Sequence, residues 1–243
     1  MDCAPTASQL LDVWEHGRFR TPAERARLLV ALAAPAPTDP GGLSIGRRDQ
    51  TLLELRERIF GPRLAGLAQC PACACEIELD LPVDRLRAGA ASSAVEPYSL
   101  RSDGYEVRFR LPTVDDLAAV GAMDGAPARR SSLLRQCVTE ARLNGAPAPA
   151  DSLPDAVTLA ISERMAELDP QGDIRLDLQC PECAHRWQAP LDVVSYLWSE
   201  IHAWAQRMLR DVHDLACAYG WSEADILAMG ATRRDAYLEL IRQ

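Results

Sequence analysis

The stretch that decides the fold is residues 174–187, IRLDLQCPECAHRW, together with its counterpart at residues 64–79, LAGLAQCPACACEIEL. Each contains the motif Cys-Pro-x-Cys, and each motif lies between residues that favour β-strands. Two residues between thiols let one turn present both sulfurs to one cation, and two such turns complete a tetrahedron. The pattern therefore predicts a zinc ribbon whose metal ligands are Cys70, Cys73, Cys180 and Cys183.

The predicted ribbon is split, because 107 positions separate Cys73 from Cys180. Four thiolates close the coordination shell and leave no water to activate, so we expect one structural Zn²⁺ per chain rather than a metal enzyme. Two alternatives remain open: ordinary reduced thiols, and a redox dithiol. Redox pairs work from a helix N-terminus, whereas a strand is expected after each pair here.

Two further residues lie close enough to the cysteine pairs to matter. Cys75 follows Cys73 by two positions, and His185 follows Cys183 by two. Either side chain has the chemistry of a zinc ligand. Because each half already supplies two thiols, we expect both residues to support the ligands rather than to replace them.

The rest of the chain predicts an α+β fold, with a mostly helical body, a split four-cysteine zinc ribbon and a β-hairpin insert. Helices are expected over residues 9–15, from a Thr21 cap to about residue 33, from Ser44 to a stop at Gly61, and over 191–219. Two short helices should begin at Ser222 and Thr232. The chain is predicted to divide into an N-terminal helical segment with a linker (1–40) and a ribbon-containing helical domain (41–243). Within that domain, the ribbon halves are expected at about 63–82 and 173–190. The insert between them covers 83–172, and the C-terminal helices cover 191–243.

The insert predicts one hairpin and several helices. Apolar residues alternate over residues 98–111 around a Ser-Asp-Gly turn, which is typical of a hairpin. A helix should open at Thr113. Helices are also predicted over residues 129–143 and 154–168, separated by an Asn-Gly-Ala-Pro turn at 144–147.

The C-terminal helices carry most of the large aromatic side chains. Two interpretations remain open for them, packing within the chain and contact with a partner, since Trp and Tyr are common interface anchors. The candidate partner-binding residues are Trp198, Trp204, Tyr219, Trp221 and Tyr237.

Composition narrows the class of protein. The net charge is −9, the pI is about 5.0 and every basic side chain is Arg, so the overall field disfavours nucleic acid and anionic membranes as partners. A zinc-ribbon module that binds nucleic acid or the transcription machinery remains the alternative class. With no secretory signal, spanning segment or catalytic motif, we expect a cytoplasmic protein without catalytic residues.

Several motifs together resemble one family, the T-even phage baseplate hub assembly proteins, which occur beside genes for phage-tail-like contractile injection systems. The resemblance extends over about residues 43–241 and leaves the N-terminal helices outside it. The motifs that carry it are LSIGRRD (43–49), LLELR (52–56), FG (60–61), LPT (111–113), LDP (168–170), the two Cys-Pro-x-Cys pairs with His185 and Trp187, and YGWSE (219–223).

The resemblance implies an assembly chaperone or minor structural component that binds hub, spike or tail-tube proteins and catalyses nothing. It leaves open the direct partner, the oligomeric state and whether the protein stays in the finished particle. The family pattern usually has Gly after the second Cys of each pair, where this chain has Ala74 and Ala184.

Overall fold

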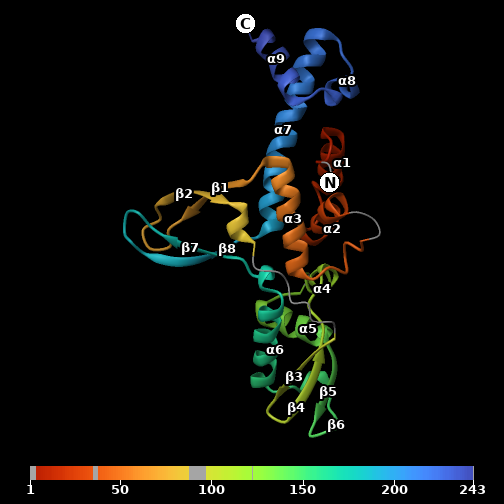
Figure 1. Cartoon of the computed structure of the whole chain (residues 1–243), viewed down its shortest axis with the longest axis vertical. Coiled ribbons are helices and arrows are strands. Elements are labelled where there is room, and N and C mark those ends of the chain that lie inside the picture. The colour runs from red at the N-terminus through yellow and green to blue at the C-terminus, as the bar shows by residue number, and fades with distance from the viewer. Residues whose placement is uncertain (1–3, 35–37, 88–96, 122, 243) are drawn as a thin grey trace.

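The computed structural model describes residues 4–34, 38–87, 97–121 and 123–242. The molecule is elongated, with a helical centre, a ribbon extending to one side and a smaller lobe at each end (Figure 1). Its accessible surface is 14277 Å², whereas a compact monomer of this mass exposes about 10,700 Å². The excess arises because the side chains form three separate hydrophobic cores. The predicted α+β class is confirmed.

The central body consists of α1 (Ala7–Gly17), α2 (Pro22–Ala33), α3 (Ile45–Phe60) and the first half of α7 (Val193–Tyr219). Thr6 and Thr21 begin α1 and α2 with capping boxes, and Ser44 caps α3. Gly61 ends α3 with a φ of 87°, a conformation that glycine adopts without strain. The buried apolar side chains of this core include Trp14, Leu29, Leu52, Leu55, Leu197, Trp198 and Ile201.

A buried ion pair joins α3 to α7. Arg56 on α3 donates from Nε and Nη2 to the two carboxylate oxygens of Glu200 on α7, at 3.0 and 2.8 Å, and from Nη1 to the Gly61 carbonyl. The Tyr196 hydroxyl donates to the Ala65 carbonyl at 2.6 Å and so extends the network to β1. Burial and the Glu200 carboxylate raise the pKa of Tyr196 to about 12, which keeps this hydroxyl a donor.

The ribbon is made of two hairpins, as predicted. β1 (Arg63–Gln69) pairs antiparallel with β2 (Glu76–Pro82), and β7 (Arg175–Gln179) pairs with β8 (Arg186–Pro190). The two hairpins form separate two-stranded sheets. Burial alternates along the strands, so that buried or half-buried apolar side chains share one face of each hairpin. The other face is mostly polar but includes Leu67 of β1, which is 68 % exposed.

The insert folds into a lobe with a four-stranded sheet, which we call the sheet lobe. Its strands are β3 (Tyr98–Ser102), β4 (Tyr105–Phe109), β5 (Val138–Leu143) and β6 (Ala146–Pro147), in that order. The helices α5 (Ala126–Cys137) and α6 (Asp155–Leu168) belong to this lobe, and α6 contributes Val157 and Ile161 to its core. The predicted hairpin at 98–111 is therefore half of a larger sheet.

The prediction of a continuous helix over residues 129–143 is wrong. The helix ends at Cys137, and the chain continues as β5 along β4, with Ala141 opposite Val107. Asn144 and Gly145 have φ values of 51° and 88° and turn β5 into β6. An Asn-Gly pair with positive φ at both positions is the strongest short hairpin signal, and β-branched Val138 and Thr139 favour a strand.

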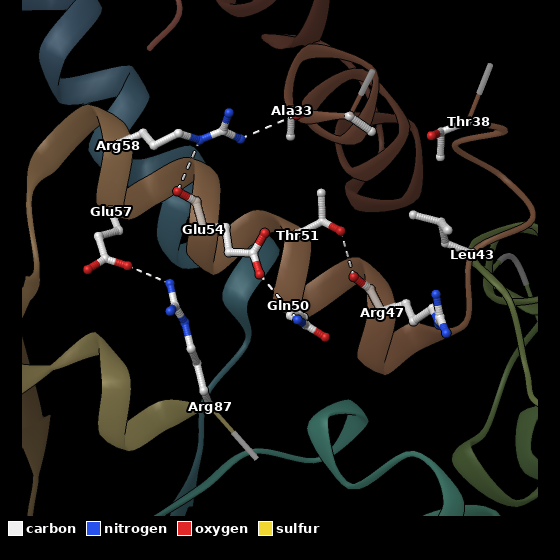
Figure 2. Close-up of a pocket in the computed structure, with 11 residues that line it drawn as sticks. Ala33, Thr38, Leu43, Arg47, Gln50, Thr51, Glu54, Glu57, Arg58 and Arg87 are labelled. Atoms are coloured by element: carbon white, nitrogen blue, oxygen red, sulfur yellow. Dashed lines mark hydrogen bonds and ion pairs between the residues drawn. The ribbon is translucent and has the colours of Figure 1, made fainter. Parts of the chain in front are cut away.

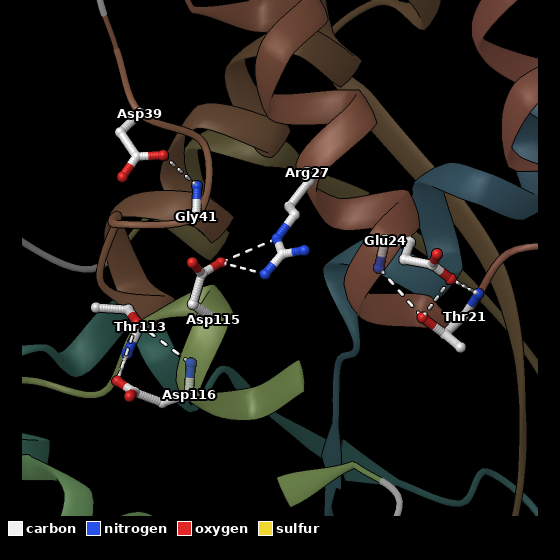
Figure 3. A network of polar contacts seen from close by, with 8 residues as sticks. All are labelled: Thr21, Glu24, Arg27, Asp39, Gly41, Thr113, Asp115 and Asp116. Carbon is white, nitrogen blue, oxygen red and sulfur yellow. Dashed lines mark hydrogen bonds and ion pairs between the residues drawn. The ribbon is translucent and has the colours of Figure 1, made fainter. Parts of the chain in front are cut away.

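The sheet lobe connects to the central body through α4 (Val114–Val120), which is preceded by the Thr113 cap as predicted. Figure 3 shows this connection. The Arg27 guanidinium of α2 pairs with Asp115, with Nε 2.9 Å from Oδ1. The Asp115 N–H donates to the Gly41 carbonyl, and the Val114 N–H donates to the Leu43 carbonyl. The chain entering α3 is therefore hydrogen-bonded to the start of α4.

A second connection covers the N-terminus of α3. The buried Asp169 carboxylate accepts from the Gly46 N–H at 2.8 Å, and a side chain at Gly46 would collide with it. A carboxylate at this position also interacts favourably with the helix dipole. Three short 3₁₀ turns complete the connections: η1 (Val83–Leu86), η2 (Ala150–Ser152) and η3 (Pro170–Gly172).

The C-terminal lobe consists of the end of α7, α8 (Glu223–Ala228) and α9 (Ala231–Ile241), packed around Leu215, Ile226 and Leu238. Gly220 ends α7 with a left-handed φ of 69°, and Ser222 caps α8 as predicted. The helix predicted to begin at Thr232 is present as α9, and it begins one residue earlier, at Ala231 after Gly230. None of the described helices is long and apolar enough to cross a membrane.

Replacing Glu200 by Ala should destabilise the chain by about 3 kcal/mol, because the buried Arg56 guanidinium would lose its counter-charge. Denaturant unfolding monitored by circular dichroism measures this change. Arg164→Ala is the matched control, since it removes an exposed ion pair with Glu167 and should cost under about 0.5 kcal/mol. Equal effects of the two changes would contradict the role assigned to the buried pair.

Candidate metal centre

The two Cys-Pro-x-Cys turns have the same backbone geometry. In the first turn, the Cys70 N–H donates to the Cys75 carbonyl, and the Ala74 N–H donates to the Cys70 carbonyl, both at 2.9 Å. The second turn repeats both bonds, at 2.9 and 3.0 Å, through Cys180, His185 and Ala184. Each turn thus joins its two strands and directs its two thiols to the same side.

The structure brings the four predicted ligands together. The Sγ atoms of Cys70 and Cys183 lie 3.6 Å apart, as do those of Cys73 and Cys180, and all four sulfurs lie within 4.8 Å of one another. A tetrahedral zinc with Zn–S bonds of about 2.3 Å places its sulfurs about 3.8 Å apart. A disulfide would require about 2.05 Å. The four thiols are therefore spaced to hold a metal ion.

The electrostatics of the group favour a bound cation. The N–H groups of Cys183 and Glu182 point at the Cys180 sulfur and are the main reason that its pKa falls to about 7. The Cys75 N–H lowers the pKa of Cys73, but the thiols around it outweigh this and raise that pKa to about 12. Four crowded sulfurs cannot all be anionic without a neutralising charge, which a metal ion supplies.

Cys75 and His185 contact the group through their backbones, and the Cys75 thiol also interacts with the Cys180 thiol. Their N–H groups face the sulfurs of Cys73 and Cys183 and favour the thiolate forms, but burial and the neighbouring thiols outweigh this and raise the pKa of both cysteines. The Cys75 thiol donates to the Glu76 carbonyl at 3.4 Å, and the His185 ring stacks on Trp187 with 6.0 Å between centroids. Across the described residues, the group that could share a metal consists of the four cysteines and does not include these side chains.

Ala74 and Ala184 occupy a conformation that favours glycine. Both have a φ of 59°, in the left-handed region. This conformation turns the chain that follows each alanine, so that the Cys75 and His185 carbonyls accept from the N–H groups of Cys70 and Cys180. A Cβ in this region costs about 1–2 kcal/mol. Glycine avoids this cost, whereas Ala74 and Ala184 each destabilise the folded state by about that amount.

The five aromatic candidates for partner binding lie in two places, two of them in the core of the central body and three in the C-terminal lobe. Trp198 is buried, stacks under the Arg25 guanidinium at 4.5 Å and covers Gly17, where any side chain would collide with its ring. Trp204 is half-buried at the edge of the same core.

The other three aromatic candidates form one cluster in the C-terminal lobe. Tyr219 and Trp221 stack with centroids 4.6 Å apart, and Tyr237 meets both rings edge-on. Tyr219 is 39 % exposed. This cluster therefore both packs the lobe and presents an aromatic surface.

A polar groove of about 710 Å³ runs along α3 (Figure 2). The Arg58 guanidinium at its rim donates to the Ala33 carbonyl at 3.2 Å, and Arg87 pairs with Glu57. Glu54 accepts from the Gln50 amide at 3.2 Å. Arg87 and Glu57 thus pair with each other, and Arg58 and Glu54 bind uncharged groups, which is typical of a solvated surface groove.

Comparison with known families gives the context of this site. Residues 31–195 match the family model described as T4 bacteriophage base plate protein. The chain belongs to this family. No curated protein and no solved structure matches the chain.

The match with the base plate family includes both cysteine pairs, the sheet lobe and, in the central body, helix α3 with the last turn of α2. It ends in the first turn of α7, so the YGWSE motif and the C-terminal lobe lie beyond the matched span. The base plate context predicted from the sequence is therefore confirmed, and it extends to a role in the structure or assembly of a phage baseplate and to contact with other baseplate proteins.

Purified protein should contain about one zinc per chain by elemental mass spectrometry. Cys70→Ser and Cys180→Ser should each lose the metal and cooperative unfolding of the ribbon, because each removes a ligand from a different hairpin. Cys75→Ser and Cys217→Ser are matched controls and should keep the zinc. Zinc retained by Cys180→Ser would contradict a shared site.

Ala74→Gly and Ala184→Gly should each stabilise the chain by about 0.5 to 1 kcal/mol, because relief of the left-handed strain exceeds the entropic cost of glycine. Denaturant unfolding of the metal-loaded protein measures the gain. Ala72→Gly, in the same turn but without a left-handed φ, should give no gain. A loss of stability in Ala74→Gly equal to that in Ala72→Gly would show that the strain is absent.

Proposed function

We propose that this protein is a non-enzymatic assembly chaperone or minor structural component of the baseplate hub of a contractile, phage-tail-like injection system, and that one structural Zn²⁺ stabilises it. The observation that carries the proposal is the group of four cysteine sulfurs within 4.8 Å in a chain of the base plate family. Membership of the family supports the baseplate role, and the four thiols support a structural zinc.

Zinc fits this donor set better than the other common metals. Four thiolates in a tetrahedral arrangement are typical of zinc or iron–sulfur sites. Turns that contribute two sulfurs each, followed by strands, are typical of zinc ribbons. The ion would join two hairpins that share no strand pairing in the described part of the chain, and isolated two-stranded hairpins are marginally stable in water.

The surroundings of the cysteines support a structural rather than a chemical role. A shell of four thiolates leaves no open position for water or substrate. Each pair is followed by a strand, β2 or β8, whereas redox dithiols are activated at a helix N-terminus. These features argue against the redox alternative, and the net charge of −9 argues against a nucleic-acid-binding ribbon.

The shape of the molecule supports a role in binding other proteins. Its accessible surface of 14277 Å² exceeds that of a compact chain of equal mass by about a third. Three lobes project from one helical body, so several partner surfaces are available at once (Figure 1). The proposed partners are hub, spike or tail-tube proteins encoded with this chain, in the cytoplasm where the particle assembles.

Affinity purification of the tagged chain, co-expressed with the hub, spike and tail-tube proteins, tests the proposal. At least one of these proteins should be enriched with the wild-type chain and with Cys75→Ser, and lost with Cys180→Ser, whose ribbon lacks its metal. Enrichment of none of the three by the wild-type chain would overturn the assembly role. The oligomeric state of the complex can be read from the same material by light scattering.

A further inference from the structure

A groove of about 540 Å³ lies between the central body and the C-terminal lobe, and we call it the α1–α8 groove. One wall comes from the N-terminal end of α1, another from α7, and the third from α8 and the residues leading into α9, and α3 adds Arg58 and Ile59. The large apolar side chains that line it are Leu10, Ile59, Trp204, Met208, Leu227 and Met229. Methionine side chains adapt their shape to a ligand, and tryptophan is a common interface anchor.

The charges of the groove have one sign. Among the described residues that line it, Arg58 and Arg234 are charged and none carries a carboxylate. The sign is opposite to the net charge of the whole chain, which is −9. The groove therefore complements a ligand that is apolar and negatively charged.

Arg234 is buried without full use of its donors. The residue is 7 % exposed, and in the described structure its Nε atom has no hydrogen-bond partner. The nearest counter-charge is Asp211 of α7, with Oδ2 3.5 Å from Nε, which is an ion-pair distance but not a good hydrogen bond. Nε itself is fully buried, so a carboxylate in the groove would meet Arg234 where the residue lines the groove and would add to the incomplete pairing of its guanidinium.

We propose that the α1–α8 groove binds a short apolar segment of a partner baseplate protein, and that a carboxylate on that segment pairs with Arg234. This inference rests on the proposed function and adds the chemistry of one recognition site to it. Apolar side chains of the segment fill the space between Trp204, Met208 and Met229. All three walls lie outside the span matched by the base plate family model, which includes only Arg58 and Ile59 of the residues that line the groove.

Binding of a fluorescent model peptide to the full-length, metal-loaded chain tests the chemistry. The probe is acetyl-Leu-Met-Glu-Leu-Leu-amide, measured by anisotropy beside its Gln and Lys analogues. The Glu peptide should bind at least about tenfold more tightly than either analogue, which corresponds to about 1.4 kcal/mol. Equal binding of the three peptides, or binding of none, would overturn the carboxylate specificity.

Substitutions at Ala228 test the location, because this residue lines the groove, is exposed and makes no core contact that a longer side chain would disturb. Ala228→Glu adds a negative charge and should weaken both the peptide and the co-purified baseplate partner about tenfold or more. Ala228→Lys, of similar size, should not weaken them. Arg234→Gln should reduce the preference for the Glu peptide over its Gln analogue, with circular dichroism confirming that it folds.

The outcomes separate this inference from the proposed function. If Ala228→Glu and Ala228→Lys both bind hub, spike or tail-tube protein like the wild-type chain, the groove inference is overturned and the assembly role stands. If the chain forms a dimer that Ala228→Glu dissociates, the occupant is a second copy of this chain, and the inference is overturned as well. If the wild-type chain binds none of the three partners, the assembly role itself fails.

Discussion

The meeting of two cysteine pairs that lie 107 positions apart is the constraint on which the rest of the chain depends. Because β1 and β2 follow α3 directly and β8 leads directly into α7, closing the four sulfurs also brings α3 and α7 alongside each other. The buried pair between Arg56 and Glu200 then holds the two helices in register. Everything between the pairs must leave this point and return to it, which explains why the sheet lobe forms a separate body with its own core.

Helix α7 connects the central body, where the ribbon is attached, to the C-terminal lobe. At 27 residues it is about 40 Å long, and its two halves belong to different cores. Leu197 and Ile201 pack in the central body, whereas Leu215 packs in the C-terminal lobe. Because the helix is continuous and has no hinge between these cores, it holds the C-terminal lobe at a fixed distance from the ribbon. The hydroxyl of Tyr196 fixes the ribbon end of this helix to β1.

Local chemistry made much of this fold predictable. The capping residues Thr21, Ser44 and Ser222 and the stops at Gly61 and Gly220 act within one turn of chain, and they begin and end helices where the sequence indicates. The structure also places the four cysteines as their spacing predicts.

What the sequence did not reveal depends on distant partners. Residues 138–143 have helical neighbours, but the free edge of β4 makes them a strand, and only the Asn144–Gly145 pair signals it locally. Arg56 and Glu200 lie 144 positions apart, and each alone resembles an ordinary surface charge. Arg234 resembles any other helix-face arginine for the same reason, since its burial and its unused Nε arise only when α9 folds against α7. Residues that define a groove between lobes therefore escape sequence analysis, whereas residues that define a turn or a metal site do not.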